Sequence, residues 1–366
     1  MRSGLTVEIV LRIRRLLDAL FLTNYYIMLL LSLPDLKDKQ VQSKLTLCKK
    51  QTPSWDSYFS QYNTILQILI NIGLTNNHTY FREFAMPFLF IFRHTIELQL
   101  KRELYDRGIQ VQNRHELNID SYREFLPEGF YCNLEVLDIK GDGSCFRYIS
   151  DKNNKPYYNI VDSLDIFSPI KYYINNNLNV LVMPKVRFGE EKMKANCVYT
   201  TNLCTNIGTL RTQYDTCLSL LVHSINDGKV KIDEIIIPLY FLLRHCLELG
   251  LKCSILALNI DITNHYFKEL EINVVDSIKT ALKNVDTKDK ICRDLIYDKD
   301  NLSNLLLLIE SKDKSSEVFR YPVNRKNKTV TLSIGGKSFL KDLTLYSKCD
   351  SFLSFALLYL KEEELI

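Results

Sequence analysis

The chain has 366 residues, of which 46% are hydrophobic, 25% charged and 11% aromatic, a composition typical of a folded globular protein. Only 12 Gly and 9 Pro occur, and no Gly-x-Gly-x-x-Gly or Gly-x4-Gly-Lys-Ser/Thr stretch, which argues against sandwiches, barrels, Rossmann folds and P-loops. The net charge of +4 permits an anionic partner without requiring one, because a dedicated nucleic-acid surface is usually more basic.

The N-terminal segment combines several arginines with an apolar run from Leu16 to Leu33. A signal peptide or membrane anchor shares this pattern, but Asp18 and Asn24 interrupt the run and no small-residue cleavage site follows. We expect a packed or surface amphipathic helix, with a membrane anchor as the alternative. Residues 1–50 are therefore assigned to an N-terminal helical extension, and no membrane partner is expected.

The ten cysteines favour a reducing environment. None lies in a Cys-x-x-Cys pair, and Cys217, Cys246 and Cys253 lie inside apolar helical runs. This pattern predicts reduced, buried thiols in a cytoplasmic protein rather than an extracellular disulfide framework.

An internal duplication organises the chain. Residues 88–101 align without gaps on residues 239–252, and both segments contain Arg-His-x2-Glu-Leu-x-Leu-Lys. Other landmarks recur in the same order: Gln61-Tyr62, Pro87, His115 and Phe146-Arg147-Tyr148 in the first copy, and Gln213-Tyr214, Pro238, His265 and Phe319-Arg320-Tyr321 in the second. Residues 51–200 are therefore predicted to form a first repeat with a linker, and residues 201–366 a second repeat.

The predicted elements are mostly helices. Apolar residues recur at steps of three and four over 56–74 and 211–226, which indicates amphipathic helices, and each proline suits the first turn of the helix that carries Arg-His. Both Phe-Arg-Tyr segments are typical of β-hairpins, because aromatic or β-branched runs flank a polar turn. A strand-like run covers 179–183, and the second copy has a longer helical insertion at 272–311. The expected fold is mainly α, with two tandem homologous helical bundles that each carry a small β-hairpin.

Each signature helix, as we call the helix that contains Arg-His, carries an ionic stripe. Its four polar side chains fall within one arc, since an α-helix turns about 100° per residue. They are Arg93, His94, Glu97 and Lys101 in the first copy and Arg244, His245, Glu248 and Lys252 in the second. The rest of the circumference is apolar, so each helix is expected to be buried and its charges to need partners.

The stripes have two interpretations. In the structural one, each glutamate pairs with the arginine and lysine one turn away, and the stripes fix the register of the bundle. In the functional one, the cations hold a phosphate while His94 or His245 moves a proton. Arg147 and Arg320 would add to such an anion site, or would instead pair with the glutamates of the stripes. The sequence leaves both interpretations open.

No metal or cofactor site is expected. His115 and His265 do not fit one, because no His-x3-His, Cys-x2-Cys or His-Glu-x-x-His pattern occurs. A supporting or capping role beside the binding residues suits them better. Nucleophile elbows are also absent.

The duplicated Arg-His helix, the histidine that follows it and Phe-Arg-Tyr-Pro resemble the HEPN superfamily of helical domains. The resemblance covers residues 55–160 and 210–335, with the complete Phe-Arg-Tyr-Pro only at 319–322. It implies RNA or a nucleotide as ligand, a protein partner, no DNA-specific motif, and a bacterial defence or toxin–antitoxin context.

The same resemblance implies a composite site. Active HEPN ribonucleases join arginine and histidine across a dimer interface, and here Arg93 and His94 would meet Arg244 and His245 within one chain. The site would then be a metal-independent endoribonuclease in which histidine removes the 2′-OH proton and arginines stabilise the phosphate, with the two stripe glutamates included. The usual motif separates its arginine and histidine by several residues, whereas here they are adjacent. The alternative is a non-catalytic sensor, antitoxin-like or scaffold subunit.

Overall fold

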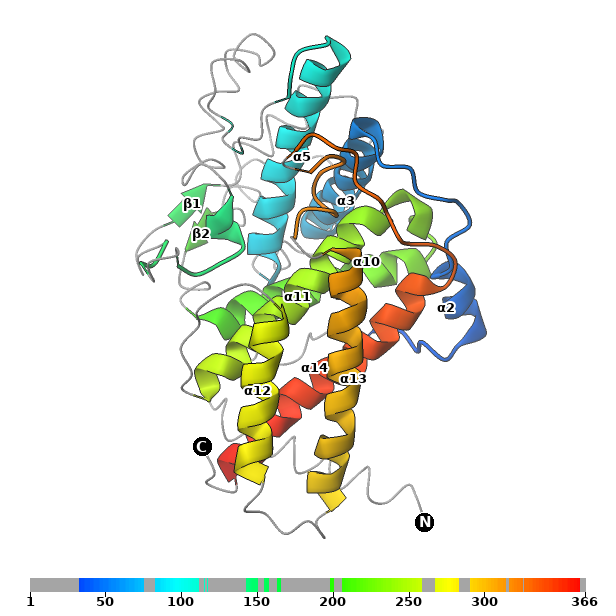
Figure 1. The fold of residues 1–366 in the computed structure, drawn as a ribbon. Helices are drawn as coiled ribbons and strands as arrows, with labels where there is room; N and C mark the ends of the chain where they lie inside the picture. Colours follow the sequence, from blue (N-terminus) through cyan, green and yellow to red (C-terminus); the bar gives the residue numbers. More distant parts are fainter. Residues whose placement is uncertain are drawn as a thin grey trace. The chain divides into compact units, whose positions relative to one another are not determined.

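In a computed structural model the chain divides into two units, residues 1–32 and 33–366, and the elements given below belong to the second (Figure 1). The N-terminal helix, the strand-like run at 179–183 and His265 lie outside the described residues. The structure describes residues 33–75, 83–111, 115, 117, 143–150, 155–157, 163–165, 198–200, 206–258, 267–282, 290–313, 316–324 and 326–362.

The described part of the chain is mainly helical, as predicted. None of its helices is long and apolar enough to cross a membrane. The elements are α2 (Lys39–Lys44), α3 (Trp55–Thr75), α5 (Ala85–Asp106), the 3-10 turn η2 (Ser144–Phe146), β1 (Ser163–Asp165), β2 (Val198–Thr200), α10 (Ile207–Asn226), the 3-10 turn η4 (Ile232–Glu234), α11 (Ile236–Ala257), α12 (Phe267–Leu282), α13 (Lys290–Lys312) and α14 (Ser338–Glu362).

Helices α3 and α10 begin where the sequence supplies polar caps. Ahead of α3, the amide of Ser57 donates to Oγ of Ser54 at 3.0 Å. At the start of α10, the side chain of Asn206 accepts from the amide of Thr209 at 2.7 Å, which satisfies one of the unpaired donors of the first turn. The amphipathic helices predicted over 56–74 and 211–226 are thereby confirmed as α3 and α10.

The signature helices α5 and α11 are buried along most of their length, as their apolar circumference predicts. Pro87 and Pro238 each lie in the first turn, where a missing amide proton costs nothing. Within the halves α3 packs on α5 and α10 on α11, and between them α5 packs on α10 and α3 on α11. Phe90 and Phe241 stack at a ring-centroid distance of 4.6 Å where the two signature helices meet. One core therefore includes both halves.

Two buried glutamines join the halves at helix N-termini. Oε1 of Gln61, on α3, accepts from the amide of Ile237 in the first turn of α11 at 2.8 Å. Oε1 of Gln213, on α10, accepts from the amide of Met86 in the first turn of α5, also at 2.8 Å. Each glutamine thus satisfies an amide that has no partner inside its own helix.

The Phe-Arg-Tyr segments form tight turns, and the paired strands expected there are not seen among the described residues. In the first, the amides of Arg147 and Tyr148 both donate to Ser144 O at 2.9 Å. Beyond the turns each segment makes one isolated antiparallel bridge, Ser150 with Pro156 and Val323 with Thr329. The only two-stranded sheet in the described part pairs β1 with β2, between the copies.

Carbonyls in these turns accept side-chain hydrogen bonds from the opposite half. The hydroxyl of Tyr62 donates to Phe319 O at 2.9 Å, and that of Tyr214 donates to Phe146 O at 3.0 Å. The segment after α13, drawn in orange in Figure 1, accordingly runs beside α3 and α5. These bonds hold each turn against the opposite half of the chain.

The predicted helical insertion at 272–311 forms α12 and α13, which α14 follows. These helices pack on one another, and both α12 and α14 contact α11. Gly250 on α11 permits the close approach of α14, because a Cβ there would lie 3.3 Å from Cδ1 of Leu353. The first copy has Gln99 at the aligned position.

We expect Gln61→Leu and Gln213→Leu each to lower the free energy of unfolding by about 1–3 kcal/mol, because a buried helix-terminal amide loses its acceptor. Urea unfolding measures the effect. The matched control is Gln67→Leu, a half-buried glutamine on the same helix as Gln61, which should change stability by less than about 0.5 kcal/mol. Equal losses in all three variants would contradict the capping role.

Candidate functional site

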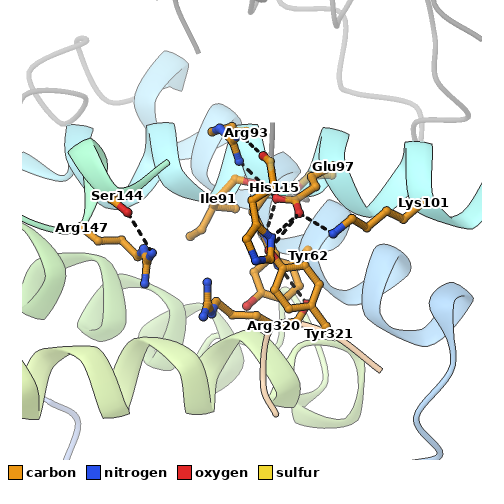
Figure 2. Close-up of polar contacts among 12 residues, drawn as sticks. Tyr62, Ile91, Arg93, Glu97, Lys101, His115, Ser144, Arg147, Arg320 and Tyr321 are labelled. Atoms are coloured by element: carbon orange, nitrogen blue, oxygen red, sulfur yellow. Dashed lines mark hydrogen bonds and ion pairs between the residues drawn. The ribbon is translucent and has the colours of Figure 1, made fainter. Parts of the chain in front are cut away.

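The first ionic network is centred on Glu97, which is fully buried. Its Oε2 lies 3.1 Å from Nη1 of Arg93, and its Oε1 accepts from Nζ of Lys101 at 2.8 Å and from the Tyr321 hydroxyl at 2.9 Å (Figure 2). Nδ1 of His115 lies 3.1 Å from the same Oε1. Burial works to raise the pKa of Glu97, but Lys101 and the hydrogen bond from His115 outweigh it and hold the pKa well below its usual range.

The second network repeats this arrangement around Glu248. Its Oε2 lies 3.2 Å from Nη1 of Arg244, and its Oε1 accepts from Nζ of Lys252 at 2.8 Å. Arg244 also donates from Nε to the carbonyl of Asp313 at 3.3 Å. Nζ of Lys252 lies 4.4 Å from the ring centroid of Tyr148, much as Lys101 lies over the tyrosine of the other copy at 4.5 Å. In both stripes, therefore, one buried glutamate bridges the arginine and the lysine of its own helix.

The signature histidines link each helix to the Phe-Arg-Tyr segment of the opposite copy. Nε2 of His94 lies 3.0 Å from the carbonyl of Arg320, and Nε2 of His245 lies 3.0 Å from the carbonyl of Arg147. The two imidazoles are 1% and 2% exposed as residues. Burial lowers the pKa of each to about 4, against the opposing influence of the glutamate beside it. Both are neutral at pH 7.

Buried tyrosines surround these histidines. The ring of Tyr62 meets that of His94 edge-on at 4.7 Å, and Tyr214 meets His245 in the same way at 4.4 Å. Burial raises the pKa of both tyrosines well above its usual value, so the hydroxyls act as donors to the carbonyls described above.

Several site residues expected from the sequence thus come together, though in a different arrangement. The glutamates of the stripes pair with their own arginines and lysines, as the structural interpretation predicts. Arg320 does not pair with a stripe glutamate: its Nε donates to Ser316 O at 2.6 Å. His115, expected in a supporting role, contacts Glu97 directly and its side chain is 35% exposed.

Some residues of the site were not expected from the sequence to contribute. Tyr62 and Tyr214 were landmarks of the duplication without a role, although Gln-Tyr at the start of both helices was the signal for them. Tyr321 was known only as the last residue of the Phe-Arg-Tyr motif, and nothing in the sequence pointed to Asp313. Among the described residues, no group of His, Cys, Asp or Glu side chains is arranged to hold a metal ion.

Comparison with family models, curated proteins and solved structures finds no match to this chain. The HEPN resemblance therefore rests on the residue pattern alone.

The buried histidines make stability sensitive to acid. Their pKa of about 4 in the folded protein lies below 6.5, so between these values the unfolded chain binds protons that the folded chain does not. The contribution of each histidine to the free energy of unfolding is fully present above pH 6.5. It is lost as the pH falls toward 4, and the loss is about 3 kcal/mol for each histidine.

Urea unfolding between pH 7 and pH 4 measures this loss. His94→Gln and His245→Gln should each reduce the slope of stability against pH, since glutamine can still donate to the carbonyl but does not titrate. The matched comparison is His223→Gln, which makes the same substitution at a half-buried histidine on α10 outside the site. An unchanged slope in both signature variants would rule out neutral burial of these histidines.

Glu97→Gln and Glu248→Gln should each destabilise the protein by about 3–5 kcal/mol, because each leaves buried cations without a carboxylate. Thermal and urea unfolding provide the measurement. Glu103→Gln on α5 is the matched control, since the Glu103 side chain is 38% exposed and its pairing with Arg102 contributes at most about 1 kcal/mol. A Glu97 variant as stable as the Glu103 variant would show that the network is not needed for folding.

Proposed function

We propose that this chain is a HEPN-like protein that binds RNA or a nucleotide together with a protein partner, and that it does not cleave through His94 or His245. In this proposal two tandem homologous helical bundles, derived from one ancestral module, share a single core. The matched geometry supports it: the glutamate–lysine distance is 2.8 Å in both networks, and the histidine–carbonyl distance is 3.0 Å in both.

The environment of the signature histidines is the observation that carries this proposal. A general base must lie within hydrogen-bond reach of the proton that it removes. Nε2 of each histidine contacts a backbone carbonyl, which only accepts, so Nε2 is the donor of this bond. Nδ1 faces a buried glutamate, at 3.5 Å from Glu97 and 3.8 Å from Glu248. Both ring nitrogens therefore face groups of the protein. The histidines have a structural role in this proposal, since each holds the two halves together through its hydrogen bond.

The biological setting in this proposal comes from the HEPN resemblance: a bacterial defence or toxin–antitoxin system, in which the chain is the sensor, antitoxin-like or scaffold subunit. A net charge of +4 suits a single bound anionic group better than a long nucleic-acid track. The buried thiols of Cys217 and Cys246 fit the cytoplasmic location that we infer.

A second candidate, a metal-independent ribonuclease, is favoured by the position of His115. Its Nδ1 lies beside the Glu97 carboxylate and the Tyr321 hydroxyl, while the side chain is 35% exposed. A carboxylate on one ring nitrogen orients a histidine and leaves the other nitrogen to act as a base. In this mechanism Nε2 takes the 2′-OH proton, the 2′-oxygen attacks phosphorus, and the 5′-oxygen leaves, which gives a cyclic phosphate.

An RNA cleavage assay with EDTA and total cellular RNA separates the two candidates. We expect wild type to cleave no more than a protein-free control, because the signature histidines are buried and engaged. The variants are His115→Ala and the double variant His94→Gln/His245→Gln, whose folding is checked by thermal unfolding.

Cleavage by wild type that is lost in His115→Ala and kept in the double variant would establish the second candidate. If the folded double variant loses cleavage and His115→Ala keeps it, the proposed structural role of the signature histidines would be contradicted.

A further inference from the structure

The two Phe-Arg-Tyr arginines extend toward one another between the signature helices (Figure 2). Arg147 follows η2 in the first copy, and Arg320 lies in the turn after α13 in the second. They are only 8% and 9% exposed. Both guanidinium groups act on the same buried hydroxyl, since each works to lower the pKa of Tyr62 against the larger effect of burial. Two permanent cations therefore share one buried region.

Arg320 differs from the buried cations of the stripes. Arg93, Lys101, Arg244 and Lys252 each face a buried glutamate. Arg320 instead donates from Nε to a backbone carbonyl, and no carboxylate in the described part of the chain forms an ion pair with it. Its two terminal nitrogens remain as donors for a further group.

Asp313, at the end of α13 and ahead of this turn, is engaged elsewhere. Oδ1 of Asp313 accepts from the amides of Glu317 and Val318 at 3.0 and 3.2 Å, and its Oδ2 lies 3.9 Å from Nε of Arg244. Asp313 therefore caps the turn that carries Arg320 and does not neutralise the charge of Arg320. A buried guanidinium without a carboxylate is strongly unfavourable, and a second one pointing toward it adds repulsion.

We propose that Arg147 and Arg320 form an anion site that takes the terminal phosphate of a small molecule, a nucleotide in the first place. The inference rests on the proposed function, and it names the ligand class and the residues that hold it. A guanidinium fork offers paired N–H donors that match phosphate oxygens, and two forks from opposite sides can hold one phosphate between them.

The surroundings of the site favour a small ligand over a polymer. Arginines that are more than nine-tenths buried do not reach the internal phosphates of a bound RNA strand, whereas a terminal phosphate can enter alone. Oγ of Ser144 lies 3.4 Å from Nη2 of Arg147 and adds a hydroxyl. The guanidinium carbon of Arg147 lies 5.5 Å from the ring centroid of Phe90 and 5.1 Å from that of Tyr148, so aromatic surface adjoins the charge.

Isothermal titration of the full chain with ATP, pyrophosphate and inorganic phosphate in phosphate-free buffer tests the inference. Wild type should bind at least one of these probes. Arg320→Gln and Arg147→Gln should each weaken that binding by about tenfold or more, the loss expected for one charged hydrogen-bonding partner. Arg320→Lys keeps the positive charge but lacks the paired N–H donors of the guanidinium group, so it should also bind more weakly than wild type. It replaces Arg320→Gln if that variant does not fold.

Arg102→Gln is the matched control, because Arg102 on α5 is already near Asp56 and Glu103, and it should bind as wild type does. Tighter binding of ATP than of phosphate assigns the site to a nucleotide, and equal binding assigns it to free phosphate. No binding of any probe by wild type, or equal binding by wild type and both Arg320 variants, would overturn the site. Neither result depends on RNA cleavage, so the role of the signature histidines is tested separately, and RNA binding without binding of these probes would leave the proposed function standing while overturning this site.

Discussion

Hydrogen bonds from two buried histidines to backbone carbonyls cross between the halves of the chain, and the rest of the site depends on them. His94 holds the turn at Arg320, and His245 holds the turn at Arg147, both at 3.0 Å. The tyrosine beside each histidine adds a second bond to the residue before that arginine. Each turn therefore covers the signature helix of the other copy. The turn keeps water away from the ionic stripe of that helix. The charges of the stripe then bond to one another rather than to water.

These contacts between each turn and the signature helix of the other copy explain why the polar residues of the stripes are not arranged as a reaction centre. Glu97 uses its two oxygens for an arginine, a lysine, a histidine and a tyrosine, and one of these, Tyr321, comes from the opposite copy. The low pKa of the histidines follows from the same enclosure. Two groups differ from this closed arrangement: His115, whose side chain is 35% exposed, and Arg320, which donates from Nε to a backbone carbonyl.

Much of the fold and part of the site could be predicted from the sequence. Apolar periodicity placed α3 and α10, and a four-residue spacing predicted that Glu97 pairs with Arg93 and Lys101, since such neighbours lie on one helical face. Spacing along the chain could not show on which signature helix each Phe-Arg-Tyr segment packs. The same sequence is compatible with packing on the helix of its own copy and with packing on the helix of the other copy. Of each expected hairpin the described residues show one isolated bridge, while the carbonyls of Phe146 and Phe319 accept hydrogen bonds from tyrosines of the other copy.

The central claim is that the two halves form one cooperative structure through these crossed contacts. Trp55, the sole tryptophan of the chain, is buried on α3 in the first half, so its fluorescence reports that half, whereas far-UV circular dichroism reports the helices of both. Guanidinium unfolding followed by both signals is the most direct measurement. Coincident transitions with one midpoint are predicted. A Trp55 transition clearly separated from the loss of helix would contradict the account.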